Sequence, residues 1–248
     1  MIGTRYSKAP IAEAVIDIQV RYSEPLSPSA LSEFGQSVKS QLPLSDAIRA
    51  LEVGLASLGQ DNISSTFGQR NVGSRLTDES NSRVLQVRDV GFTYSHLPPY
   101  TEWGRFRREA ELLWSEFVKI CKPQIVTRCA VRYINKIVMP MPKFDAQRFF
   151  NIYPTVPVGI PQDIAGLFMQ LQMPQTDLDD KSAAVINIAF DSSTSVEAPT
   201  IILDFDIFKI EEIEPMSGDV WKTLERFRTR KNELFEACIT EETRELIR

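Results

Sequence analysis

The sequence predicts an α+β protein with a mostly antiparallel, curved sheet and helices on one face. Three observations support this class: strands with alternating apolar and polar residues, two long segments with helical apolar stripes, and a strand–helix–meander–helix order that occurs twice. The 248 residues are 43% hydrophobic and 25% charged, which provides enough apolar material for a real core.

The first elements are a strand and a helix. From Pro10 to Tyr22, apolar and polar residues alternate, as in a half-buried strand. A helix then runs to about Leu42, because Ser27 is a favourable N-cap and Pro28 suits the first helical position. Residues 44–60 fit either a short helix or irregular structure.

A meander and a long helix complete the first half. Ile63 to Asp78 supplies two short strands around Asn71-Val72-Gly73, and Arg83 to Leu97 forms one long strand. Thr101 caps a helix that ends near Cys121. Its apolar residues recur at steps of three and four and form one stripe: Trp103, Phe106, Ala110, Leu113, Trp114 and Phe117.

The second half has the same order of elements. The expected elements are a strand from Ile125 to Met139, a short helix from Phe144 to Ile152, strands near 164–174, 183–190 and 199–210, and a helix from about Gly218 to Cys238 capped by Ser217. A proline-rich connector lies between the short helix and the first of these strands.

The repeated order predicts a duplication of a β-α-β-β-β-α unit. Residues 1–122 would form one half and 123–248 the other, fused into one globular domain. The segments Trp103–Phe117 and Trp221–Phe235 support this, because tryptophan and phenylalanine are 14 residues apart in both. A similar repeated order of strands and helices also arises by chance in antiparallel α+β proteins.

Composition excludes several classes of protein. The net charge of −5 argues against a dedicated duplex-DNA binder. The three cysteines are odd in number and form no CxxC, so we expect them to be reduced, buried and inert. The start of the chain lacks a signal-peptide pattern, and no apolar run is long enough to span a membrane. A cytoplasmic location and no membrane partner are therefore expected.

Common catalytic sets are also missing. His96 is the one histidine, so a Ser-His-Asp or Cys-His site would have to use it. Phosphate-loop, dinucleotide-binding, nucleophile-elbow and zinc-protease motifs are absent. We expect His96 to be a surface or capping residue, no catalytic residues and no cofactor.

Three segments resemble a known family. They are Pro10-Ile11-Ala12-Glu13-Ala14-Val15-Ile16-Asp17, the helical Trp103-x-x-Phe106-x-x-x-Ala110-x-x-x-Trp114, and Val126-x-Arg128-x-x-Val131-Arg132-Tyr133-Ile134-Asn135-Lys136. In this order they are similar to a sporadically distributed family of uncharacterised bacterial and archaeal proteins of about this length. The family has no settled activity. Its patchy occurrence implies a defence or toxin–antitoxin setting.

The best candidate binding site is a basic strand face. Arg128, Arg132 and Lys136 alternate with apolar residues and share one face, where three cations can hold a phosphate, a nucleic-acid backbone or an acidic partner. We add Arg88 and Tyr133 to this candidate ligand-binding set. The alternative is cross-strand pairing of the cations with Glu13 and Asp17. If Ala130 matched Ala14 in a duplication, the arginines would face the core.

Two aspartates form a weaker candidate site. Asp204 and Asp206 are two residues apart on a predicted strand, so they share a face and could bind Mg²⁺ or Mn²⁺. A solvent-facing strand is the commoner explanation of such a pair, so no metal is expected.

From these observations we expect a non-catalytic binding or regulatory protein with a protein partner, able to form a homo-oligomer. The first alternative is a sensor of nucleotide or single-stranded nucleic acid that uses Arg88, Arg128, Arg132 and Lys136. The second is a metal-dependent phosphoryl hydrolase that uses Asp204 and Asp206.

Overall fold

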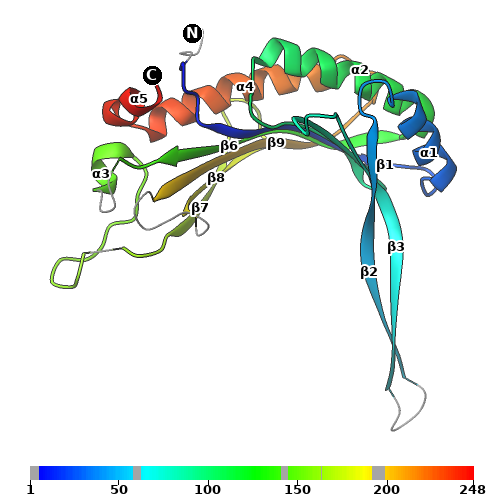
Figure 1. Cartoon of the computed structure of the whole chain (residues 1–248), viewed down its shortest axis with the longest axis horizontal. Coiled ribbons are helices and arrows are strands. Elements are labelled where there is room, and N and C mark those ends of the chain that lie inside the picture. The colour runs from blue at the N-terminus through cyan, green and yellow to red at the C-terminus, as the bar shows by residue number, and fades with distance from the viewer. Residues whose placement is uncertain (1–5, 58–62, 141–144, 163, 192–198) are drawn as a thin grey trace.

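The chain folds into a single arched sheet with a layer of helices on its convex side. A computed structural model describes residues 6–57, 63–140, 145–162, 164–191 and 199–248, with backbone alone for 50–57 and 63–70. Within these residues the sheet has nine strands in the order β2-β3-β4-β5-β1-β6-β9-β8-β7, and each neighbouring pair is antiparallel. Figure 1 shows the arch, with the β2–β3 hairpin projecting away from the helices.

The described elements follow the chain in the order below. They are β1 (Ile11–Arg21), α1 (Pro28–Ser37), β2 (Leu44–Ser57), β3 (Ile63–Thr77), β4 (Arg83–Arg88), β5 (Gly91–His96), α2 (Trp103–Cys121), β6 (Ile125–Val138), α3 (Ala146–Phe149), β7 (Phe168–Pro174), β8 (Ser182–Phe190), β9 (Thr200–Ile213), α4 (Asp219–Cys238) and α5 (Glu241–Ile247). None of these helices is long and apolar enough to cross a membrane. The α+β class and the one-sided helix layer are as predicted.

The hydrophobic core lies between the sheet and the helices. The predicted stripe on α2 is buried, and Phe92, Phe117 and Trp114 pack ring against ring. The Trp114 indole N–H donates to the Pro215 carbonyl at 2.9 Å, which ties α2 to the segment before α4. We call the other face of the sheet, turned away from the helices, the open face.

Three predictions in the first half were wrong. Residues 44–57 form strand β2, and residues 63–77 form one strand with a bulge at Val72, because Ile48 pairs with Gly73 and Arg49 with Asn71. The long strand expected over 83–97 is a tight hairpin of β4 and β5. Gly91, the first residue of β5, permits the close approach of this hairpin to β1, since a Cβ there would lie 2.4 Å from the Ile18 carbonyl oxygen.

Helix ends agree with the sequence in part. Ser27 caps α1 as predicted, since its hydroxyl accepts from the Ala30 N–H at 3.1 Å. Glu102, rather than Thr101, precedes α2. Gly218 directly precedes α4, but the capping predicted for Ser217 is confirmed, since its hydroxyl accepts from the Asp219 N–H at 3.1 Å. The short helix α3 has fewer residues than expected, and Phe144, its expected first residue, lies outside the described residues.

The first half has one strand more than the predicted unit. Four described strands lie between α1 and α2, whereas three lie between α3 and α4. In both halves the last strand of the meander pairs with the first strand of that half, β5 with β1 and β9 with β6. The two first strands, β1 and β6, pair at the centre of the sheet.

Candidate binding surface on the open face

The basic residues of β6 lie on the open face. Cys129, Val131 and Tyr133 are buried in the core, so the alternation of the strand turns Arg128, Arg132 and Lys136 to the other side. Ala130 shares the open face, whereas Ala14 of β1 belongs to the core cluster. The two alanines are therefore not equivalent, and the arginine face is not the core face.

Arg128 bridges two neighbouring strands. Its Nη1 donates to Asp17 Oδ2 of β1 and its Nη2 to Asp206 Oδ2 of β9, both at 2.8 Å. The guanidinium carbon lies 4.6 Å from the ring centre of Phe208, a cation–π contact. With a side chain only 18% exposed, Arg128 is a structural cross-link in the sheet.

Arg132 forms a bidentate pair with Asp204. Its Nε and Nη2 donate to the two carboxylate oxygens at 2.8 and 2.7 Å, and this hydrogen bonding raises the pKa of Arg132. Asn187 of β8 also donates to Asp204, at 2.9 Å, and Gln170 of β7 donates to Asn187 at 2.8 Å. Glu13 contributes to the pKa shift only from a distance.

The remaining cations of the set are paired as well. Lys136 Nζ lies 2.7 Å from Asp191. Arg88 on β4 donates to the Thr93 hydroxyl at 3.1 Å, and that hydroxyl donates to Asp17 at 2.7 Å. Asp17 thus links Arg88 with Arg128. We call this set the ion-pair ladder: Arg88, Thr93, Asp17, Arg128, Asp206, Arg132, Asp204, Asn187, Gln170, Lys136 and Asp191.

The charges of the ion-pair ladder balance. Its four cations face four carboxylates, so a phosphate would have to displace a carboxylate at short range. The predicted pairing with Asp17 is confirmed. Two of the four carboxylates, Asp204 and Asp206, come from β9, which the sequence did not place beside β6. The same contacts occupy Asp204 and Asp206. Across the described parts of the chain, no group of three or more His, Cys, Asp or Glu residues could hold a metal ion.

Asp206 carries some electrostatic strain. One carboxylate oxygen accepts from Arg128, but Oδ1 is buried and has no hydrogen-bond partner within the described residues. Burial raises the pKa of Asp206, although the neighbouring arginines act in the opposite direction.

Tyr133 does not belong to this surface. It lies on the core face, where its hydroxyl is 2.9 Å from that of Tyr100. Burial raises the pKa of Tyr133 well above its ordinary value. Lys231 of α4 lies over the Tyr133 ring at 4.0 Å from its centre, and burial lowers the pKa of Lys231 to about 7. Grouping Tyr133 with the arginines was wrong, because adjacent strand residues point to opposite faces.

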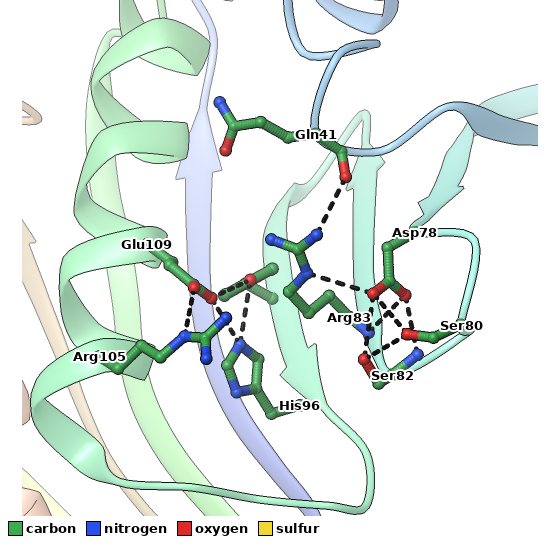
Figure 2. A network of polar contacts seen from close by, with 9 residues as sticks. Gln41, Asp78, Ser80, Ser82, Arg83, His96, Arg105 and Glu109 are labelled. Atoms are coloured by element: carbon green, nitrogen blue, oxygen red, sulfur yellow. Dashed lines mark hydrogen bonds and ion pairs between the residues drawn. The ribbon is translucent and has the colours of Figure 1, made fainter.

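His96 is buried beneath α2, not a surface or capping residue as expected. Its Nε2 lies 2.8 Å from Glu109 Oε2, which also accepts from the Tyr94 hydroxyl at 2.9 Å (Figure 2). Arg105 Nε donates to the other Glu109 oxygen at 2.9 Å. Burial lowers the pKa of His96. These contacts hold α2 on β5 and include no serine or cysteine nucleophile.

A second polar knot in Figure 2 fixes the turn between β3 and β4. Asp78 accepts from the backbone N–H groups of Ser82 and Arg83 at 2.8 and 2.9 Å, and from the Ser80 hydroxyl at 2.7 Å. Although burial acts to raise the pKa of Asp78, these hydrogen bonds outweigh it and lower the pKa. The knot is structural, since its hydroxyl and backbone N–H donors are used within the turn and Arg83 Nη2 donates to the Gln41 carbonyl at 3.3 Å.

The three cysteines are free and buried, as predicted. Burial raises the pKa of Cys121 and Cys129 to about 12 and that of Cys238 to about 11, so all three are thiols at neutral pH.

Comparison with known proteins gives no further guide to the site, because no family model, curated protein or solved structure matches the chain. The surface is therefore interpreted from its own geometry.

Proposed function

We propose that the chain is a non-catalytic binding or regulatory protein that holds a protein partner against its open face. The observation that carries the proposal is the ion-pair ladder. It fixes long side chains in place before binding, so a partner meets an ordered surface and little side-chain entropy is lost.

Exposed apolar residues next to the ladder support a protein partner. Val138, Ile210 and Phe168 lie on the open-face side of their strands and are 60%, 62% and 73% exposed. Apolar anchors of this kind, rimmed by paired charges, are typical of protein–protein interfaces. The connector before β7 adds exposed Val158 and Ile160.

The balanced charges favour a protein over a nucleic acid. Nucleic-acid affinity comes largely from cations that neutralise phosphates and release counterions. Here Arg128 and Arg132 are already neutralised by aspartates.

The biological setting is proposed from the resemblance alone. Similarity to a sporadically distributed prokaryotic family supports a partner-binding component of a defence or toxin–antitoxin system in the cytoplasm.

The test is affinity capture of the tagged chain from its native cells, followed by mass spectrometry and a nucleic-acid stain. Ile210→Glu places a charge on the open face, and Leu112→Glu places one on α2, where Leu112 is 69% exposed on the helix side. We expect one stoichiometric protein that is retained by Leu112→Glu and lost by Ile210→Glu. A partner lost equally by both variants would contradict the assignment to the open face.

A sensor of nucleotide or single-stranded nucleic acid is the second candidate function. One observation favours it: the side chains of Arg132 and Lys136 are 46% and 47% exposed despite their pairing. Nucleic acid that co-purifies, dissociates steeply with added salt and is lost in Arg132→Ala would replace the protein-partner proposal with this one.

We also propose that the two halves arose by duplication. The equivalent pairing of β5 with β1 and of β9 with β6 supports this, as do Trp103 and Trp221 at the starts of α2 and α4. The extra strand of the first half would be a later insertion. The test is a superposition of β1, β5 and α2 on β6, β9 and α4 in an experimental structure. A close fit is expected, and a fit that requires reversing a strand would contradict the proposal.

A further inference from the structure

The two edges of the sheet differ in how they are protected. Edge strands commonly carry charged residues, which prevent pairing with other chains. Strand β2 has Asp46 and Arg49, whereas the sequence of β7, Phe-Met-Gln-Leu-Gln-Met-Pro, has no charge. Two apolar side chains of β7 are also exposed, Phe168 at 73% and Leu171 at 38%.

The free backbone groups of β7 can be assigned from its bonds to β8. The Leu167 carbonyl accepts from the Phe190 N–H at 3.0 Å, and the Gln175 N–H donates to the Ser182 carbonyl at 2.8 Å. Residues with odd numbers therefore direct their backbone groups toward β8. Because this direction alternates along a strand, Phe168, Gln170 and Gln172 direct theirs outward. No loop backbone bond within the described residues reaches these three.

The sequence of β7 is also a palindrome about Leu171. Met169-Gln170-Leu171-Gln172-Met173 is the same when read in either direction. An antiparallel pair of identical strands centred on Leu171 therefore places each residue opposite its own kind: leucine on leucine, glutamine on glutamine and methionine on methionine. Such self-complementarity is what an interface with two-fold symmetry requires.

We propose that β7 pairs antiparallel with β7 of a second copy of this chain, with the two-fold axis at Leu171. The sheets of two molecules then form one continuous sheet. This inference is independent of the proposed protein partner, which occupies the open face rather than the edge.

The hydrogen-bond parity of β7 fits this register. Gln170 stands opposite the partner's Gln172, and both residues have outward backbone groups, so they exchange two N–H···O bonds. Leu171 meets the partner's Leu171 in the non-hydrogen-bonded position at the axis, where side chains come closest. Pro174 lacks an N–H, but its carbonyl is opposite the partner's Phe168 N–H. If the two-fold axis moved by half a residue, to lie between Gln170 and Leu171, outward backbone groups would stand opposite inward ones.

The side chains of β7 support the same occupant. Met169, Leu171 and Met173 share one side of the strand, and Met169 and Met173 pack against the core cluster. With the partner's copies they form an apolar stripe across the junction, which covers the exposed Leu171. A single strand pair buries less area than most permanent dimers, so we expect a concentration-dependent equilibrium.

The first test measures mass by sedimentation equilibrium and light scattering on the full chain, from micromolar to millimolar concentration. We expect a monomer–dimer equilibrium. Leu171→Lys places two like charges at the axis and should weaken dimerisation by about tenfold or more, while far-UV circular dichroism stays unchanged. Gln172→Pro removes an outward N–H and no side chain of the ion-pair ladder, and it should act in the same direction. A chain that stays monomeric throughout would overturn the proposal, as would a dimer that neither variant weakens.

Cysteine trapping tests the register. In Leu171→Cys the two thiols would face each other across a non-hydrogen-bonded pair, within disulfide reach under mild oxidation. In Gln172→Cys they would be offset by two residues and out of reach. The native cysteines are buried and do not compete. Covalent dimer in Leu171→Cys and none in Gln172→Cys is expected. Equal cross-linking, or cross-linking of Gln172→Cys alone, would overturn the Leu171 axis.

Discussion

Polar side chains are paired differently on the two faces of β6. On the open face, Arg128 and Arg132 each find carboxylates on adjacent strands at 2.7–2.8 Å. On the core face, Tyr133 pairs with a second hydroxyl, and Lys231 above it forms no ion pair within the described part of the chain. Charge complementarity therefore organises one face, whereas burial dominates the pKa values of the other.

The largest effect is expected from Arg128. Arg128→Leu leaves Asp17 and Asp206 without their shared cation, and the free energy of unfolding should fall by about 3 kcal/mol in urea titrations. The double variant Arg128→Leu with Asp206→Leu should regain part of this loss. A single variant as stable as the wild type would show that the ladder does not stabilise the sheet.

The second-largest effect is expected from the buried network of Glu109, Tyr94 and His96 beneath α2. Glu109→Ala removes the acceptor of Tyr94 and His96, and we expect a loss of about 2 kcal/mol because buried donors lose their partner. Glu109→Gln keeps an acceptor oxygen and is the matched control. Thermal unfolding of both variants measures the difference, which should be absent if α2 is held by apolar packing alone.

Lys231 should oppose stability at neutral pH. Its pKa of about 7 lies below the ordinary 10.5, so the unfolded chain binds more protons between these values and stability rises with pH there. Lys231→Met should therefore stabilise the protein by about 1–2 kcal/mol at pH 7 and remove this part of the pH slope. Unfolding in urea at several pH values tests both effects. Lys231→Arg, which stays charged, should not stabilise.

Acid should weaken the buried network of Glu109, Tyr94 and His96 in two stages. Because the pKa of His96 is lowered in the folded chain, the stability that neutral His96 contributes is present above about pH 6.5 and is lost as the pH falls below that value. The lowered pKa of Glu109 adds a loss below its ordinary value near 4.5. Comparing Tm of the wild type and His96→Gln between pH 7 and 5 isolates the first stage. Parallel curves for the two proteins would exclude it.

The smallest effect is expected from Lys136. Its side chain is 47% exposed, so solvent screens its pair with Asp191, and Lys136→Ala should change stability by about 0.5 kcal/mol or less. Urea titration with and without added salt measures this. A loss of stability as large as that of Arg128→Leu would show that the exposure of a side chain does not determine how much its ion pair stabilises the sheet.

The sequence predicted much of the local structure because local patterns carry it. The alternation over Ile125–Val138 placed Arg128 and Arg132 on one face, and Ser27 with Pro28 marked the start of α1. The hairpin inside 83–97 was missed because only two residues separate β4 from β5, although the core positions change from odd (Leu85, Val87) to even (Phe92, Tyr94) across that turn. The bulge at Val72 was missed because an extra residue is recognised only against the partner strand.

The sequence by itself determined the α+β class, the buried cysteines and the cations on one strand face, because a period of two or 3.6 residues fixes which side chains point together. Only the tertiary structure decided that β9 lies beside β6, that Asp204 and Asp206 therefore neutralise the arginines, and that His96 is buried under α2. Strand neighbours depend on how the whole sheet packs against its helices, and no local period encodes that order.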